Sequence, residues 1–381
     1  MKSTMEVVVS LLSNAIKRLY NFRPARPSKR NSTSGRWHKC RIEQMESRQL
    51  LSVSVAPIHI GSVYYEPHSG TDTSPNLIYI TWDGGAAGTY LKQIVIDTDK
   101  NQDGVISEGE CFFHTDDGGP GVYGWASPAI VEKTGITNDP VISVENGGHL
   151  LTITFTSDDF HAGGRLVLSI DVDEMGKNGI ASATAEGAEF ENSIFTATFS
   201  ATHYNTVASS GIFLDAFDSE LSGYNLNLPP DNYIPPSSDD ETVYTAGLGM
   251  SVQQTPLPIT ISGNVYEDLN LNNQFDSGEP GIGGVTLTLL SLVNNDYVST
   301  GKTATTDSNG HYTFDGVLPD TYRIVETQPD GYLSVGSAPG TVGGVTDGVS
   351  TTPDILSSIT LDGGDNSINN NFGETVPASV S

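Results

Sequence analysis

The chain has 381 residues, a length typical of two or three domains, and its formal charge is −28. Residues 1–48 hold 11 of the 18 basic residues, whereas residues 49–381 hold 7 basic and 43 acidic ones. Because residues 49–381 are this acidic, they are not expected to bind nucleic acid or an anionic membrane.

Neither a disulfide framework nor a membrane helix is expected. The chain has only two cysteines, Cys40 and Cys111, and the first lies in a basic segment that export would remove. No apolar run approaches the roughly 18 residues that a transmembrane helix needs. We therefore expect residues 49–381 to form domains that are large enough to build their own cores without disulfides.

The first predicted segment, residues 1–52, is a basic leader that is disordered over much of its length. Its stretch "RIEQMESRQLLS" (41–52) resembles the LEPR-XLL signature of bacterial surface and secreted proteins. The matching residues are Glu46, Arg48, Leu50 and Leu51, with Ser47 in place of the proline. This resemblance implies secretion or display on a bacterial cell surface. A chance match within a disordered leader is the alternative.

Residues 53–222 have the composition of a β-sandwich. β-Branched and aromatic residues concentrate in segments separated by clusters of Gly, Asp and Asn. The predicted strands are 76–82, 90–96, 150–156, 165–172 and 195–201. In the last of them Phe195, Ala197 and Phe199 alternate with threonines, which indicates one buried face. Short strands joined by such turns favour an antiparallel sandwich.

The stretch "DKNQDGVISEGE" (99–110) has the spacing of an EF-hand calcium loop without room for the exit helix. Its expected ligands are Asp99, Asn101, Asp103, the carbonyl of Val105, Ser107 directly or through water, and Glu110. Gly104 permits the sharp turn at position six, and Ile106 is the apolar residue at position eight. Calcium takes six to eight hard oxygen ligands, so the sequence predicts a calcium site. An acidic surface turn is the alternative.

Other polar residues of this region form weaker patterns. Asp171, Asp173 and Glu174 end a predicted strand, where they are either a second cation site or, in the favoured interpretation, solvated turn acids. His114, His161 and His203 lie far apart, with no ligand spacing. Glu189 and Glu191 bracket Phe190, and paired carboxylates serve glycoside hydrolysis. Nothing else supports catalysis, so no enzyme and no catalytic residue are predicted.

Residues 223–258 are predicted to be a linker. Paired prolines stiffen it and the charges of "SSDDE" extend it. A docked strand at "ETVYTAGL" is the one element of structure considered there.

Residues 259–374 carry three motifs of one module: "ITISGNVYEDLNLNNQFDSGEPGIGGVTLTLL", "TTDSNGHYTFDGVLPDTYRIVETQPDGY" and "ITLDGGDNSINNNFGE". Together they resemble the B-type domain of serine-aspartate (SD-repeat) surface proteins, a relative of the Cna B and prealbumin-like Ig modules. The residues agree with this resemblance: Leu287 and Leu289 alternate with threonines, and Tyr312 and Phe314 have core spacing. The fold class expected for the whole chain is therefore all-β, with two Ig-like β-sandwiches.

Within this module "DLNLNNQFDSGE" (268–279) repeats the loop pattern. The expected ligands are Asp268, Asn270, Asn272, the carbonyl of Gln274, Asp276 and Glu279. Asn273 takes the place of glycine at position six, where asparagine best tolerates a left-handed backbone. The resemblance implies calcium as the bound ion. Asp362 and Asp365 are a lower-ranked further site.

One feature of Cna B-like modules is not expected here. Many of them close an internal Lys–Asn isopeptide bond beside a buried acid, and Glu326 stands where that acid would be. The first strand has no lysine, and Lys302 is the only lysine in the module. Residues 375–381 include "PASVS", whose spacing matches the "PITIS" that opens the module. This segment is either the start of a next repeat or a disordered tail.

These observations predict a secreted or surface-displayed bacterial protein that binds calcium and acts as a stalk or adhesin segment. Its partner would be an unknown protein or polysaccharide of the surface or matrix. Two alternatives remain: a carbohydrate-binding domain at 53–222 on a spacer module, or the non-catalytic part of a larger exported hydrolase.

Overall fold

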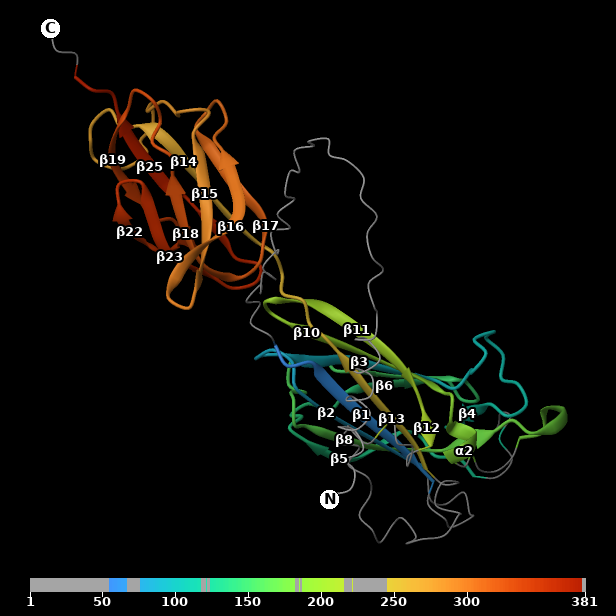
Figure 1. Cartoon of the computed structure of the whole chain (residues 1–381). Helices are drawn as coiled ribbons and strands as arrows, with labels where there is room; N and C mark the ends of the chain where they lie inside the picture. Colours follow the sequence, from blue (N-terminus) through green and yellow to red (C-terminus); the bar gives the residue numbers. More distant parts are fainter. Residues whose placement is uncertain are drawn as a thin grey trace, which may run out of the picture. The chain divides into compact units, whose positions relative to one another are not determined.

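The computed structural model describes residues 55–66, 76–117, 121, 124–181, 185, 187–215, 221 and 245–378. The leader at 1–52, with its LEPR-XLL-like stretch and Cys40, lies outside these ranges. So do most of the predicted linker and residues 379–381. The described residues form two β-sandwiches (Figure 1), which confirms the all-β fold class. Within these residues no helix reaches the length and apolar character needed to cross a membrane.

The first sandwich consists of two antiparallel sheets. One has the order β12 (Leu214–Asp215), β13 (Thr245–Val252), β1 (Ile58–Tyr65), β2 (Asn76–Asp83), β8 (Arg165–Ile170) and β5 (Ala129–Thr134). The other has the order β11 (Tyr204–Ile212), β10 (Ile194–Ala201), β3 (Tyr90–Asp97), β7 (Leu150–Thr154) and β6 (Val141–Val144). A separate ribbon pairs β4 (Cys111–Phe113) with β9 (Val172–Glu174). The described helical segments here are η1 (Lys177–Gly179) and α2 (Gly187–Phe190).

The core of this sandwich follows the predicted alternation. All five predicted strands are present, and Phe195, Ala197 and Phe199 are fully buried on one face of β10. Trp82 packs edge-on against Phe199, with ring centroids 5.1 Å apart. Burial of such large apolar side chains is the main stabilising term of the domain.

The strand β13 comes from the segment predicted to be a linker. It pairs with β1 along its whole length, from Ile58 with Val252 to Tyr65 with Thr245. Its inward residues Ala246, Leu248 and Met250 belong to the core of the first sandwich. This sandwich is thus completed by residues that lie beyond 222, and the linker prediction is corrected there. The docked strand considered at "ETVYTAGL" (241–248) is therefore present from Thr245 onward, and it extends to Val252.

The second sandwich also has two sheets. One has the order β19 (Leu333–Ala338), β25 (Asn371–Thr375), β14 (Ile259–Glu267), β24 (Asn366–Ile368), β20 (Thr341–Val342) and β21 (Val345–Thr346), and β17 (His311–Val317) also pairs with β14. The other has the order β16 (Asp296–Thr305), β15 (Thr286–Val293), β18 (Asp320–Glu326), β23 (Ile355–Leu361) and β22 (Val349–Thr352). The first strand β14 runs parallel to β24 and β25, which closes the module by joining its two ends.

The predicted core positions of this module are confirmed. Leu287 and Leu289 are fully buried, and Tyr312 and Phe314 are nearly so. Asp307 begins the "DSNG" turn, where its carboxylate accepts hydrogen bonds from the amides of Asn309 and His311. The module therefore has a continuous apolar core on which its loops are built.

Candidate metal centres

The loop 99–110 connects β3 to the short strand β4. Two backbone hydrogen bonds join its end to β9: the amide of Gly109 donates to the carbonyl of Met175, and the amide of Met175 donates to the carbonyl of Glu110. Lys100 ties the loop further, because its ammonium donates to the carbonyls of Gly109 and Glu189. Strands flank this loop where an EF-hand has helices, as the sequence predicts.

The loop 268–279 follows β14. The amide of Glu267 donates to the carbonyl of Pro280, and the amide of Ile282 donates to the carbonyl of Val265, so main-chain bonds close the base of the loop. The amide of Asp268 donates to the carbonyl of Glu374 on β25 at 2.7 Å. This loop too is mounted on strands.

The two loops share six hydrogen bonds from backbone amides to side-chain oxygens, position by position. The amides at positions five and six donate to the carboxylate at position one. The amides at positions five and seven donate to the side-chain oxygens at positions three and five. The amides at positions two and nine donate to the two oxygens of the glutamate at position twelve. In this order the donor–acceptor distances are 3.3, 2.6, 3.0, 2.9, 3.0 and 2.7 Å in loop 99–110, and 3.2, 2.7, 3.1, 2.8, 3.0 and 2.8 Å in loop 268–279.

The backbone conformations of the two loops also agree at positions four and six, where φ is positive. At position four the φ angles are 59° for Gln102 and 61° for Leu271. At position six they are 79° for Gly104 and 57° for Asn273. The left-handed conformation predicted for Asn273 is therefore present. The same ring of hydrogen bonds is thus built from two sequences that differ at half of the ligand positions.

Both ends of the first loop are buried, and so is the start of the second loop, whereas Glu279 is half-buried. Asp99 and Glu110 are 1% and 4% exposed, and Asp268 is fully buried. Burial alone would raise the pKa of Asp99, but the amides of Gly104, Gln102 and Asp103 outweigh it and lower the pKa below its usual value. In the other loop the side-chain amides of Asn270 and Asn272 donate to Asp276 and lower its pKa. Each donor set contains only hard oxygens, which suits calcium.

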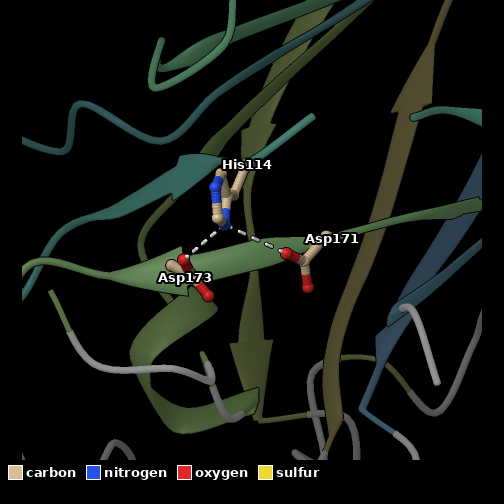
Figure 2. A group of neighbouring side chains, drawn as sticks. All are labelled: His114, Asp171 and Asp173. Atoms are coloured by element: carbon tan, nitrogen blue, oxygen red, sulfur yellow. Dashed lines mark ion pairs between the residues drawn. The ribbon is translucent and has the colours of Figure 1, made fainter. Parts of the chain in front are cut away.

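A second group of ligand-type side chains lies where β4 meets β9. Figure 2 shows the imidazole of His114 between the carboxylates of Asp171 and Asp173. Its Nδ1 is 3.4 Å from an oxygen of Asp171 and 3.1 Å from an oxygen of Asp173. All three residues are at least 96% buried. The interpretation of Asp171 and Asp173 as solvated turn acids is therefore wrong.

The sequence did not indicate that His114 belongs with these acids. The pairing of Phe113 with Val172 brings the two segments together, although they are almost 60 positions apart. The available signal was the alternation of Asp171 and Asp173 with Ile170 and Val172, since every second residue of a strand shares a face. The imidazole lies within ion-pair distance of both carboxylates, so this buried cluster contains a basic group as well as two acids.

The remaining candidate residues do not assemble into a further site. His161 and His203 hydrogen-bond to the backbone carbonyls of Thr89 and Gly363. Asp362 and Asp365 form a turn in which the amide of Asp362 donates to the carboxylate of Asp365. Glu189 lies in α2 and Glu191 just after it; burial, followed by the charge of Asp215, raises the pKa of Glu191.

Cys111 and Lys302 both contact backbone carbonyls. The buried thiol of Cys111 lies 3.2 Å from the carbonyl of Glu189. Lys302 donates to the carbonyls of Asp315 and Gly316.

Comparison with known proteins identifies the second sandwich. Residues 259–373 match the family model of the SdrD B-like domain. Over 89 residues the chain is 39% identical to serine-aspartate repeat-containing protein D of Staphylococcus aureus strain Newman, an alignment that covers 23% of this chain and 6% of that protein. Colossin-C of Dictyostelium discoideum is 32% identical over 119 residues, which cover 31% of this chain and 12% of colossin-C.

Among solved structures, pilins give alignments that cover most of the chain at low similarity. The full-length major pilin SpaD of Corynebacterium diphtheriae has a TM-score of 0.24 and 10% identity, over 84% of this chain and 68% of the pilin. BcpA, the major pilin subunit of Bacillus cereus, has a TM-score of 0.21 and 13% identity, over 83% of this chain and 71% of the pilin.

Proposed function

Residues 259–373 form an SdrD B-like domain, and from this premise we propose that the chain is a calcium-stiffened structural segment of a secreted or surface-displayed bacterial protein. It serves as a stalk or as part of an adhesin, and its partner is a protein or polysaccharide of the surface or matrix. The serine-aspartate repeat-containing proteins are much longer than the matched segment, in agreement with a modular role.

The observation that carries the proposal is the equivalence of the two loops. Six hydrogen bonds from amides to side-chain oxygens and three positive φ angles, at positions four, six and eleven, recur on two different sandwiches. The shared residues are the ones that calcium needs: a carboxylate at position one, a glutamate at position twelve and oxygen donors between them. An ordinary surface turn would not require the same side-chain oxygens to be held inward in both places.

The proposed mechanism is electrostatic. Each loop carries three carboxylates at ligand positions: Asp99, Asp103 and Glu110 in the first loop, and Asp268, Asp276 and Glu279 in the second. Without a cation these charges repel one another, and each loop is held by its hydrogen bonds alone. A bound calcium ion neutralises the charges and adds bonds between the two ends of the loop. Because each loop joins strands of a sandwich, calcium stiffens the domain itself.

Thermal unfolding of the whole chain with calcium, with magnesium and with a chelator tests this proposal. Calcium at millimolar concentration is expected to raise the Tm of both sandwiches, since extracellular calcium modules typically bind with a Kd of about 10⁻⁴–10⁻³ M. Magnesium at the same concentration is expected to give a smaller rise, because its near-octahedral demand fits a twelve-residue loop poorly. Equal effects of the two ions would refute specific calcium binding.

A further inference from the structure

The buried cluster of His114, Asp171 and Asp173 in the first sandwich brings one ring nitrogen and two carboxylates together. Strand register places them. Phe113 pairs with Val172, and the amide of His114 donates to the carbonyl of Asp171 at 3.0 Å, which continues the pairing by one residue. Side chains that lie directly or diagonally across two antiparallel strands share one face and reach one another. The imidazole therefore lies between the two acids (Figure 2).

The contacts of His114 differ from an ordinary hydrogen bond between histidine and aspartate. Its Nδ1 is 3.1 Å from an oxygen of Asp173 and 3.4 Å from an oxygen of Asp171, whereas a charged N–H···O bond is about 2.7–2.9 Å long. Among the described residues this buried nitrogen forms no hydrogen bond. The first sandwich also contains the ordinary case, in which Nδ1 of His149 is hydrogen-bonded to Oδ1 of Asp97 at 2.8 Å. Hydrogen bonding therefore does not account for a nitrogen held between two carboxylates.

The spacing of the three groups fits a metal ion between them. Zinc binds imidazole nitrogen at about 2.0–2.1 Å and carboxylate oxygen at about 2.0–2.2 Å in a tetrahedral arrangement, so its nitrogen and oxygen ligands are about 3.3–3.5 Å apart. The two nitrogen–oxygen distances of the cluster are close to this value. One ligand atom from each residue lies within 4.8 Å of the other two. We propose that His114, Asp171 and Asp173 form a zinc-binding site of the first sandwich.

The charges of the cluster favour a divalent ion. Two carboxylates and a protonated imidazole together carry one net negative charge, whereas two carboxylates, a neutral imidazole and a zinc ion are neutral. All three residues are buried, and a net charge in a buried cluster is costly. Zinc therefore balances the two acids more completely than a proton on the ring does.

The main chain around the cluster holds the ligand residues in place. The amide of Ala126 donates to the carbonyl of His114 at 3.2 Å, and its carbonyl accepts from the amide of Asp171 at 3.3 Å. A Cβ at Gly121 would lie only 2.1 Å from Nδ1 of His114, so glycine is needed where the chain passes the ring. Gly121 is half-buried, which places the ring close to the surface and gives an ion a short way in. Fixed ligands of this kind are typical of a preorganised metal site.

The nitrogen ligand distinguishes this site from the loops 99–110 and 268–279. Their donor sets contain only oxygen, which suits calcium, whereas imidazole is a ligand for zinc and other transition metals. Three protein ligands also leave the fourth position of the zinc tetrahedron to a water molecule. The inference goes beyond the calcium-stiffened segment proposed above and does not depend on it.

The test is hydrogen exchange of the whole chain in saturating calcium, with and without saturating zinc, read at residues 111–114 and 171–174. Zinc is expected to slow exchange at these strands at least tenfold, because it binds the folded state and ties the two strands together. Asp173→Asn and His114→Gln, each made alone, remove one ligand and are expected to abolish the slowing. The matched control is His149→Gln, which removes the imidazole of the ordinary histidine–aspartate pair and should leave the slowing intact.

Three results would overturn the inference. The first is that zinc does not slow exchange at these strands in wild type, which would identify the cluster as an ion pair and needs no variant to fold. The second is slowing that persists in both Asp173→Asn and His114→Gln. The third is slowing that is lost in Glu110→Gln, which would place the zinc in the calcium loop. If Glu110→Gln loses its response to calcium and keeps its response to zinc, the two sites are independent, as the inference expects.

Discussion

The loops 99–110 and 268–279 each have three carboxylates at their expected ligand positions, but the third carboxylate stands at a different position in each loop. Both have an acid at positions one and twelve. The third acid is Asp103 at position five in the first loop and Asp276 at position nine in the second, where Ser107 and Asn272 take the complementary places. The six shared hydrogen bonds are unaffected by this exchange, because asparagine and aspartate both offer an oxygen at position five. The shared hydrogen bonds therefore depend on the acids at positions one and twelve, and the third carboxylate can stand at position five or at position nine.

The buried acids of the two sandwiches differ in another way. In the first sandwich Asp171 and Asp173 surround His114, so a potential positive charge is part of the cluster. In the second, Glu326, Asp354 and Glu374 have no such partner among the described residues. A buried acid cluster that contains an imidazole also offers a nitrogen ligand to a metal ion, whereas burial of carboxyl groups without a base favours their protonated form.

The largest expected effect comes from the glutamate at position twelve. Glu110→Gln should remove the calcium-dependent protection of the first sandwich and leave that of the second, and Glu279→Gln should do the reverse. Each change replaces a bidentate carboxylate by a neutral amide, so we expect the calcium affinity of that loop to fall by more than tenfold, or more than about 1.4 kcal/mol.

Limited proteolysis during a calcium titration measures this loss domain by domain. The controls are Glu108→Gln and Asp296→Asn, which remove an exposed acid from each sandwich without touching a proposed ligand. Loss of protection in both sandwiches from either single change at position twelve would show that the loops are not independent sites.

The next effect is a pH dependence of the stability of the second sandwich, whose buried acids have no basic partner among the described residues. The pKa of Glu326 is about 9 in the folded chain, against an ordinary value of 4.5, because of burial and then the charges of Glu374 and Asp354. The folded state therefore keeps a proton that the unfolded state loses. Its contribution to stability is fully present below about pH 4.5 and is lost as the pH rises toward 9. Burial also raises the pKa of Glu374 to about 7. In chelator the free energy of unfolding should fall by up to about 1.4 kcal/mol per pH unit for each of the two groups, up to about pH 7 for Glu374 and up to about pH 9 for Glu326.

Denaturant unfolding of the second sandwich at several pH values measures this slope. Glu326→Gln should remove the part of the slope above about pH 7, since the amide does not titrate, and should leave the part that Glu374 contributes at lower pH. A slope that persists unchanged in Glu326→Gln would assign the proton uptake to other groups.

The sequence was most informative where the site is local. Twelve consecutive residues carry each loop, so spacing alone located the side chains that accept the loop's hydrogen bonds and the left-handed turn at Asn273. The two buried clusters join strands that are distant in sequence, and register decides which residues meet. Position 326 was singled out only through a family resemblance, and Glu374 was missed, although its place two residues after Phe372 marks an inward position. The strands β5 and β6 were missed as well, because short strands carry little local pattern.

The third prediction moves charge between the middle positions of a loop. Asp103→Asn removes one of three carboxylates from loop 99–110 and should weaken its calcium binding about tenfold. Adding Ser107→Asp recreates the arrangement of loop 268–279 and should restore the affinity to within about threefold. Calorimetric titration of the two variants measures both steps, with Glu108→Gln as a control for charge alone. If the double variant binds no better than Asp103→Asn, then the position of the charge matters and the loops are not equivalent.

The smallest effect is expected at position six, where the two loops use different residues for one conformation. Gly104 has φ of 79° with no atom within 4 Å of the place where a Cβ would be, so Gly104→Ala costs only backbone strain, about 1 kcal/mol. Asn273 has φ of 57°, and its amide donates to the carbonyl of Ser337 at 3.2 Å. Asn273→Gly relieves strain and loses that bond, so the two changes should cancel to within about 0.5 kcal/mol, whereas Asn273→Ala should cost at least as much as Gly104→Ala. Chemical denaturation of the three variants in chelator measures these differences. A cost for Asn273→Gly as large as that for Asn273→Ala would mean that the contact with Ser337, rather than backbone conformation, selects asparagine at this position.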